Sequence, residues 1–283
     1  MGMRPRTAER VAFGALLVAS LIVLLPVAVI LVTIVVRGGG AITWEFLTSM
    51  PRMGMRAGGI FPAIIGTCYL VTGALVVALP LGVAAAIYLS EYARPGPLRH
   101  VIEVAIVNLA GVPSVVFGLF GLALFVTFFR FGVSLVSGSL TLAVMILPVV
   151  ITTSREALQS VPVSFRQVSL SLGVTKWSTI RHAVLPNALP GILTGTILGL
   201  SRAAGETAPI LFTVAAFYLP RLPQSIFDQA MTLPYHLYVL STQVPNVKPA
   251  IQYGTTLVLV GLIVLMNVVA IIIRSRLRRR RTW

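Results

Sequence analysis

Charged residues are scarce in this sequence. Asp, Glu, Lys and Arg make up 10% of its 283 residues, whereas soluble domains carry about 25%. Hydrophobic residues make up 57%, and the mean hydropathy is +0.96. This balance excludes a water-soluble globular protein. It also excludes a disordered chain, which needs few apolar residues and many charges. We therefore expect most of the chain to lie in a lipid bilayer.

Cysteine, histidine and acidic residues are also few, which limits the disulfides, metal sites and catalytic groups that the chain can form. Cys68 is the single cysteine, so no intramolecular disulfide can form. The three histidines are far apart and lack the spacing of a metal site: His100, His182 and His236. The sole aspartate, Asp228, lies outside the long apolar runs. No Ser/His, two-histidine or paired-aspartate group lies inside those runs, so the sequence predicts neither an intramembrane enzyme nor a cofactor or metal site.

Six apolar runs are long enough to cross a bilayer, which takes about 20 residues. They cover residues 11–36, 57–90, 104–129, 131–154, 187–218 and 249–273. We expect the start of the fourth run, up to Gly138, to form a turn. Pro26, Pro80, Pro113 and Pro148 lie inside four of the runs, where neighbouring helices can satisfy the freed backbone groups. The sequence therefore predicts an all-α polytopic membrane protein with six transmembrane helices, in one transmembrane domain over residues 1–283.

The distribution of basic residues predicts the orientation. If the N-terminus is cytoplasmic, 15 of the 22 Lys and Arg residues lie in cytoplasmic segments, among them Arg4 and the arginines of residues 278–281. Six lie on the other side: Arg37, Arg52, Arg56, Arg130, Arg221 and Lys248. Cytoplasmic loops carry the excess of basic residues. We therefore expect both termini in the cytoplasm, and we interpret the C-terminal arginines as a membrane-surface anchor.

The cytoplasmic segment 155–186 has the pattern of two short helices joined at a glycine. Val161 and Pro162 mark a break in the helical pattern. After it, Gly173 fits the end of a first helix, and Thr175 can cap a second one. Phe165 and Trp177 are then available to dock on another protein. The alternative is an amphipathic loop that rests on its own membrane domain, and periodicity alone favours neither.

The fifth run contains a charged pair, Arg202 and Glu206. The two residues are four apart, so on a helix they share one face and can form an ion pair. An ionised side chain near the bilayer centre costs on the order of 2.5–3.5 kcal/mol, so such residues persist only where they face protein or water. A purely structural ion pair is one interpretation. A functional site is the other, because intramembrane ionisable residues are functional candidates by default.

The residue types around this pair suit an anion. A guanidinium presents a planar fork of donors that matches phosphate or carboxylate oxygens. Glu206 competes with an anion for Arg202 and so prevents binding that is too tight for transport. Thr207 and Thr213 can add hydroxyl donors, and Pro209 can kink the helix near the pair. We expect Arg202, Glu206, Thr207 and Thr213 to lie along a substrate pathway.

The segment 155–186 resembles the signature loop of ABC-transporter permeases. The family pattern is Glu-Ala-Ala, three residues, Gly, nine residues, Ile, one residue and Leu-Pro. Here Gln167-Val168-Ser169, Gly173, Ala183 and Leu185-Pro186 occupy those positions, with Gln167 in place of Glu and Ala183 in place of Ile. The resemblance implies the ABC importer type I permease fold and a coupling loop that docks on a separate ATP-binding subunit. It assigns docking to Phe165, Gln167, Leu172, Gly173, Trp177, Leu185 and Pro186.

The stretch Arg-Ala-Ala-Gly-Glu-Thr-Ala-Pro at residues 202–209 is similar to the phosphate-specific branch of these importers, the PstA permease subunits. The resemblance implies a bacterial inner-membrane protein that translocates inorganic phosphate. It implies a heterodimer with a PstC-like permease, two PstB-like ATPases and an extracytoplasmic PstS-like phosphate-binding protein. ATP hydrolysis then belongs to a partner chain, and Arg202 and Glu206 are important for transport.

Two other kinds of transporter remain open from the residues alone. An ABC permease for another oxyanion or a small organic solute could use the same arginine. A gradient-driven secondary transporter could use the Arg202–Glu206 pair for ion coupling, although the two-helix loop would then have no role.

Overall fold

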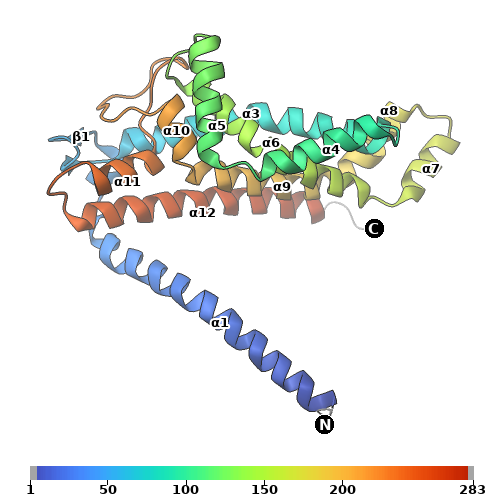
Figure 1. The fold of residues 1–283 in the computed structure, drawn as a ribbon, viewed down its shortest axis with the longest axis horizontal. Helices are drawn as coiled ribbons and strands as arrows, with labels where there is room; N and C mark the ends of the chain where they lie inside the picture. The colour runs from blue at the N-terminus through green and yellow to red at the C-terminus, as the bar shows by residue number, and fades with distance from the viewer. Residues whose placement is uncertain (1–4, 280–283) are drawn as a thin grey trace.

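The computed structural model describes residues 5–279, and helices make up most of that range (Figure 1). The long helices are α1 (Pro5–Gly38), α3 (Phe61–Ile87), α6 (Leu135–Gln159), α9 (Leu185–Gly205) and α12 (Pro249–Arg279). Of the arginines that predict the orientation, Arg4, Arg280 and Arg281 lie outside the described residues.

Shorter elements join the long helices. The short α-helices are α2 (Trp44–Thr48), α4 (Pro97–Ala110), α5 (Ser114–Gly121), α7 (Val163–Ser171), α8 (Lys176–Thr179), α10 (Ala208–Thr213) and α11 (Leu233–Thr242). One 3-10 turn, η1 (Gly39–Ala41), and three π-helical segments are also present, namely η2 (Tyr88–Tyr92), η3 (Leu122–Phe128) and η4 (Ile180–Val184). Strands β1 (Pro51–Arg52) and β2 (Ala57–Gly58) pair antiparallel as a small ribbon, with Pro51 opposite Gly58.

Five helices of the described chain are long and apolar enough to cross a membrane, and a sixth span results if α4 and α5–η3 count as one. The arrangement is that of an all-α polytopic membrane protein. The span predicted over residues 104–129 is present as a bent pair of helices, because the chain bends by 104° between α4 and α5. Pro113 lacks an N–H group and disfavours helical geometry in the residue before it, so the helix breaks there.

The fifth apolar run differs from its prediction at both ends. α9 ends at Gly205, and α10 is followed by an irregular segment, residues 214–232. Pro209 cannot donate an N–H group to the carbonyl of Gly205, and glycine itself weakens a helix. At the other end, α8, η4 and α9 form one 30-residue helix, Lys176–Gly205, rather than a span that begins near Asn187.

The fourth run becomes helical earlier than predicted. α6 begins at Leu135, so Gly138 belongs to the helix and not to a turn. Ser134 precedes the helix in extended geometry, and its Oγ accepts a hydrogen bond from the Ser137 N–H at 3.3 Å. This side-chain cap satisfies an N–H group that the first turn leaves free, which fixes the helix start.

α6 forms the centre of the helical layer between α3 and α9 (Figure 1). Within its most apolar window, 67% of the residues are buried. A β-carbon added at Gly195 of α9 would overlap the Thr153 side chain of α6, and one added at Gly82 of α3 would overlap Val150. Small residues let membrane helices approach closely, so α3, α6 and α9 pack as one tight layer.

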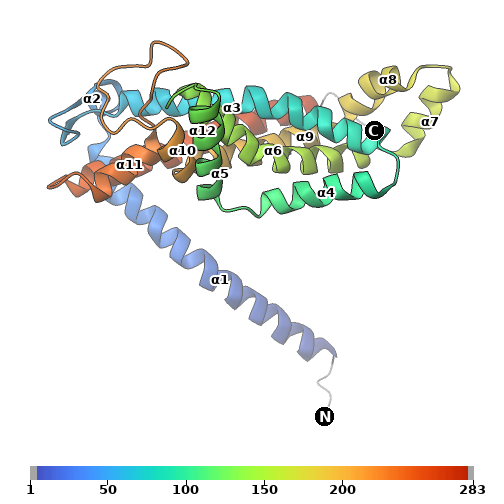
Figure 2. The same ribbon diagram turned by 45° about the horizontal axis from the view of Figure 1, so that its top comes forward.

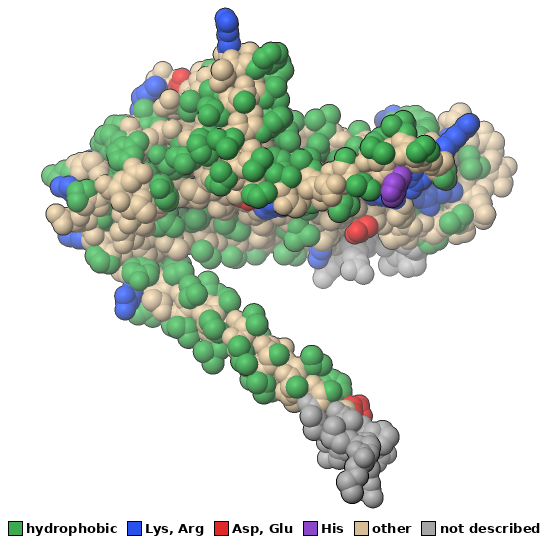
Figure 3. All heavy atoms as spheres, in the orientation of Figure 1, with side chains coloured by type: hydrophobic (Ala, Val, Ile, Leu, Met, Phe, Trp, Pro, Cys, Tyr) green, Lys and Arg blue, Asp and Glu red, His purple; other side chains and the backbone are tan. Residues whose placement is uncertain are grey.

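α1 leaves this layer at an angle (Figures 1 and 2), and none of its most apolar window is buried. Hydrophobic side chains are spread along the part of α1 whose side chains are described (Figure 3). Its C-terminal end contacts α12, where Gly38 lies against the backbone of Tyr253 and Gly254. The Arg37 guanidinium lies 5.6 Å from the centre of the Tyr253 ring. α1 is therefore attached to the layer at one end and presents its apolar surface outward.

Candidate functional site

Arg202 and Glu206 meet where α9 ends. Arg202 lies in the last turn, and Glu206 follows the final helical residue in extended geometry. The distance from Arg202 Nε to Glu206 Oε1 is 3.6 Å. That distance exceeds the 2.7–3.2 Å of an N–H···O hydrogen bond. No described residue accepts a hydrogen bond from the Arg202 guanidinium, whose side chain is 34% exposed. Its donors remain available for another group.

The backbone beside this pair is irregular. The Glu206 N–H reaches back to the Ala203 carbonyl at 3.4 Å, and helical bonding resumes with the Leu211 N–H and the Thr207 carbonyl at 3.0 Å. Irregular backbone at membrane depth is tolerated only where it is buried in protein or lines a water-filled cavity. A break at this point is therefore compatible with a membrane position only if the pair faces protein or water.

The two threonines of the predicted pathway lie in different surroundings. Thr207 is half-buried and follows Glu206 directly in the break. Thr213 is fully buried, and its hydroxyl donates a hydrogen bond to the Pro209 carbonyl at 2.7 Å. The Thr213 methyl group faces Gly121 at the end of α5. The structure thus brings Arg202, Glu206 and Thr207 together and places Thr213 in the packing between α10 and α5.

Polar contacts join α9 to α12 on the N-terminal side of the Arg202–Glu206 pair. Ser201 Oγ lies 2.6 Å from Asn267 Oδ1, and nearer the start of α9 the Arg274 guanidinium donates to Thr194 Oγ1 at 2.9 Å. Sequence reasoning missed these contacts. The signal that could have found the first is the amide of Asn267, a polar side chain inside an otherwise apolar run.

The predicted two-helix loop is present as an elbow, defined as residues 163–179. α7 is followed by Gly173, whose φ is +75° and whose N–H donates to the Leu170 carbonyl at 3.0 Å. Thr175 caps α8, since its Oγ1 accepts from the Ser178 N–H at 3.3 Å. α7, Gly173 and α8 form a helix–Gly–helix arrangement, and α8 continues into the long helix Lys176–Gly205. The elbow lies at one end of the molecule (Figure 1).

The residues predicted to dock on another subunit divide into two groups. Gln167, Leu172, Gly173 and Trp177 are exposed, with 77% of Leu172 and 54% of Trp177 accessible. Phe165, Leu185 and Pro186 are half-buried. Phe165 packs against an apolar cluster at the ends of α3 and α6, and it lines a hollow of about 400 Å³ together with Val168, Leu172 and Ala183. The exposed group is accessible to a partner, whereas Phe165 and Leu185 pack against the apolar cluster.

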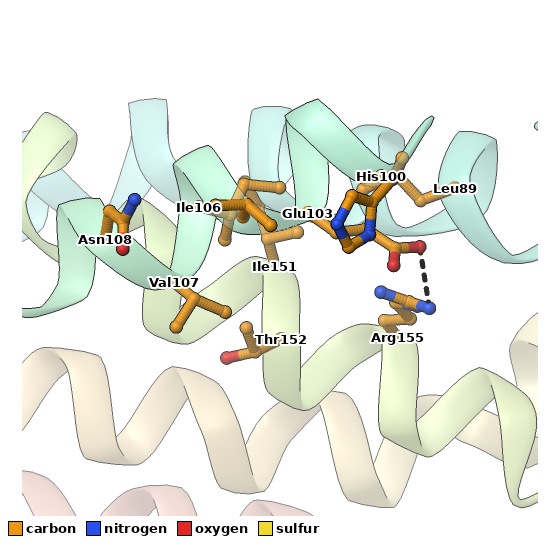
Figure 4. A pocket seen from close by; sticks show the side chains of 10 residues that line it. Leu89, His100, Glu103, Ile106, Val107, Asn108, Ile151, Thr152 and Arg155 are labelled. Atoms are coloured by element: carbon orange, nitrogen blue, oxygen red, sulfur yellow. Dashed lines mark ion pairs between the residues drawn. The ribbon is translucent and has the colours of Figure 1, made fainter. Parts of the chain in front are cut away.

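A second charged group joins α4 to α6. Glu103 accepts from Arg99 Nε at 2.7 Å and lies 2.8 Å from Arg155 Nη2 (Figure 4). A hollow of about 290 Å³ lies beside it, lined by His100, Asn108 and several apolar side chains. The contact between Arg99 and Glu103 has helical i,i+4 spacing, whereas the one to Arg155 joins two helices. The carboxylate offsets part of the positive charge of the two arginines and ties the helices together, so we treat this group as structural.

Comparison with known proteins identifies the kind of chain to which these features belong. Residues 78–283 match the model of the family described as binding-protein-dependent transport system inner membrane component. The chain is 34% identical to the phosphate transport system permease protein PstA 1 of Mycobacterium tuberculosis, over 99% of this chain and 92% of that protein. It is 33% identical to the probable ABC transporter permease protein YqgI of Bacillus subtilis, over 84% of this chain and 85% of that protein.

A solved structure has the same fold. The chain is similar to a chain of a bacterial alginate ABC transporter in complex with an alginate pentasaccharide-bound periplasmic protein, with a TM-score of 0.66 and 13% identity. The similarity covers 97% of this chain and 96% of that one. It shows the fold of an ABC importer permease.

Proposed function

Because the chain belongs to the family of binding-protein-dependent transport system inner membrane components, we propose that it carries inorganic phosphate into the cytoplasm as one permease subunit of an ATP-driven importer. It is a multi-pass inner-membrane permease that works with an ATPase and a binding protein. The chain is a transport component and not itself catalytic, so ATP hydrolysis belongs to a partner.

The Arg202–Glu206 pair at the end of α9 carries the proposal for phosphate. The loose 3.6 Å contact leaves the guanidinium donors available, and a guanidinium binds phosphate oxygens through two parallel hydrogen bonds. Glu206 repels the anion and competes for the same donors, so phosphate is bound weakly enough to leave. Thr207, in the same break, can add a hydroxyl. Relatives at 34% identity that carry the name phosphate transport system permease support this substrate.

We further propose the assembly of the phosphate-specific importers. This chain pairs with a PstC-like permease, binds two PstB-like ATPases and receives phosphate from a PstS-like protein. The exposed Gln167, Leu172 and Trp177 of the elbow contact an ATPase, and the half-buried Phe165, Leu185 and Pro186 belong to the same docking segment. In this arrangement the fold is the type I importer permease with six spans and cytoplasmic termini. The N-terminal end of α1 and the C-terminal end of α12 point toward the elbow end of the molecule, which supports that orientation (Figures 1 and 2).

Uptake by the complete transporter in vesicles tests the role of Arg202. Arg202→Ala removes the anion ligand from the pathway, and we expect phosphate uptake to fall at least about 100-fold, as for a lost ligand that contributes roughly 3 kcal/mol. Arg221→Ala is the matched control, because Arg221 is an exposed arginine that also lies 3.5 Å from an acidic residue, Asp228. Normal uptake by Arg202→Ala would remove this residue from the pathway.

The same vesicles test the substrate and the energy source. Phosphate, sulfate and molybdate are compared, and we expect uptake of phosphate alone. Uptake should stop when ATP is removed while a proton gradient is maintained. Transport that continues under that condition contradicts the ATP-driven mechanism and favours a secondary transporter, and preferred uptake of sulfate or molybdate contradicts the proposed substrate.

A further inference from the structure

The elbow is attached to the end of α3 through Glu91. This residue lies in η2, the π-helical segment that continues α3. Arg166 of α7 donates to its carboxylate, with Nη2 at 2.7 Å and Nε at 3.2 Å from Oε1. Only 9% of the Glu91 side chain and 20% of the Arg166 side chain are exposed. A shielded ion pair with two donors fixes the geometry of its partners more firmly than a surface salt bridge does.

Arg166 also joins α7 to the end of α6. Its Nη1 donates to the Val161 carbonyl and its Nη2 to the Leu158 carbonyl, each at 2.8 Å. These carbonyls belong to the last turn of α6 and to the segment that follows, where helix ends leave acceptors that need donors. One guanidinium therefore connects η2, the end of α6 and α7.

Lys176, the first residue of α8, contacts the same point. Its Nζ donates to the backbone carbonyl of Glu91 and lies 4.9 Å from the centre of the Tyr92 ring. The ammonium is thus held by a carbonyl and by a cation–π contact. Both halves of the elbow, on either side of Gly173, are fixed on η2.

A cluster of buried apolar side chains joins the same helix ends, and Phe165 of α7 packs against it. The buried side chains come from the ends of α3 and α6, from η4 and from the start of α9: Ala86, Ile87, Ala157, Leu158, Val161, Ile180, Val184, Ala188 and Ile192. Close-packed side chains transmit displacement because they cannot be compressed. The apolar cluster therefore resists approach of the helix ends, and the polar contacts to Glu91 resist their separation.

We propose that Glu91 and Arg166 are positioning residues that pass displacement of the docked elbow to α3 and so link ATP hydrolysis to opening of the pathway. The proposal rests on the proposed function of the elbow as the docking segment. Without the ion pair, Arg166 still holds α7 on the end of α6, but α7 is no longer attached to η2, so less of its displacement reaches α3. ATP is then hydrolysed with little phosphate carried.

The test uses the complete transporter in vesicles with Glu91→Gln, which keeps the side-chain size and removes the negative charge. Two ratios are measured: ATP hydrolysis with phosphate-loaded binding protein relative to hydrolysis without it, and phosphate taken up per ATP. We expect each ratio to fall about tenfold, a size typical of coupling between distant sites. Glu45→Gln is the matched control, since the Glu45–Arg52 contact is exposed and 4.0 Å long, and we expect wild-type ratios for it.

Ratios separate coupling from stability. If the ion pair has a purely structural role, Glu91→Gln lowers both hydrolysis rates by the same factor and leaves the ratios unchanged. Unchanged ratios overturn the proposal. Glu91→Asp retains the carboxylate, and we expect it to recover part of the loss. If Glu91→Gln does not assemble, Arg166→Lys serves instead, because it keeps the positive charge and loses the two-donor fork. Lowered ratios for Arg166→Lys support the proposal, and wild-type ratios overturn it.

Docking is measured separately by crosslinking from Leu172→Cys in a Cys68→Ala background. A crosslink to the ATPase in Glu91→Gln, together with lowered ratios, supports the proposal because docking persists while coupling is lost. If Leu172→Cys gives no such crosslink with Glu91 intact, the docking function of the elbow fails, and this proposal fails with it.

Discussion

His236 is buried, and no residue that the structure describes forms a hydrogen bond with its Nδ1. It lies in α11, a helix that is not among the candidate spans, and it is 3% exposed. Burial lowers the pKa of His236 from its ordinary 6.5 to about 4, because the charged imidazole would lose its water. The folded protein therefore keeps this histidine neutral at neutral pH.

This pKa predicts a dependence of stability on pH. Between pH 6.5 and 4 the unfolded chain binds a proton at His236 and the folded chain does not, so acidification favours unfolding. The pKa difference corresponds to about 3 kcal/mol of stability, present above pH 6.5 and lost as the pH falls toward 4. Thermal unfolding of the detergent-purified protein at a series of pH values measures it.

His236→Leu removes the titrating group, and its unfolding should depend less on pH over that interval. His182→Leu is the matched control, because His182 is exposed. An unchanged pH profile in His236→Leu would show that other groups account for the acid sensitivity.

Sequence spacing found one of the ion pairs and missed others. Arg202 and Glu206 are four apart, so helical periodicity alone brings them together. Arg166 and Glu91 are 75 positions apart and meet only because α7 folds back on the end of α3. No local pattern encodes that contact, since it depends on how separate helices are arranged in space.

Among the helices, the ends were harder to predict than the apolar centres. Hydropathy located the long helices, because each needs a continuous apolar surface in lipid. The bend at Pro113 and the break at Glu206 were not predicted as helix ends. Their geometry depends on packing: a β-carbon at Gly118 of α5 would contact the Phe212 ring at 2.8 Å and the Pro209 Cα at 3.0 Å in α10. That close contact of α5 on α10 involves residues far apart in the sequence.

Close packing of α6 and α9 at Gly195 predicts the effect of a larger side chain. Gly195→Val would force its side chain into Thr153 and separate the helices. Overpacking of this kind costs about 1–3 kcal/mol. We expect a lower unfolding temperature for the detergent-purified protein.

Gly261→Val in α12 is the matched control, because a β-carbon at Gly261 meets no atom of residues 5–279 within 4 Å. Both changes place a valine in a membrane helix, so helix propensity and hydrophobicity are equal. Equal unfolding temperatures for the two variants would contradict tight packing at Gly195.

At the scale of the whole molecule, the ribbon of β1 and β2 and the elbow lie at opposite ends of the helical layer (Figure 1). The excess of basic residues predicts that the elbow end is cytoplasmic. Met53, in the ribbon turn, is 80% exposed, and Ser171, at the end of α7, is also exposed. The two positions can therefore report the orientation of the chain.

In intact cells carrying Cys68→Ala, a membrane-impermeant thiol reagent should label Met53→Cys from outside. It should label Ser171→Cys only after the membrane is opened. Each variant is the control for the other, because both present an accessible thiol. Labelling of Ser171→Cys in intact cells would reverse the orientation and place the docking elbow on the wrong side for a cytoplasmic ATPase.

The continuity of α8, η4 and α9 has a mechanical consequence. The elbow and Arg202 lie near opposite ends of one 30-residue rod, which is about 45 Å long at 1.5 Å per residue. Such a rod is a lever. A tilt of about 5° about the elbow end moves the far end by about 4 Å, which exceeds the roughly 0.5 Å range of hydrogen-bond lengths. A small rotation on one side of the membrane is thus geometrically sufficient to make or break the contacts of Arg202 without any change within the helix.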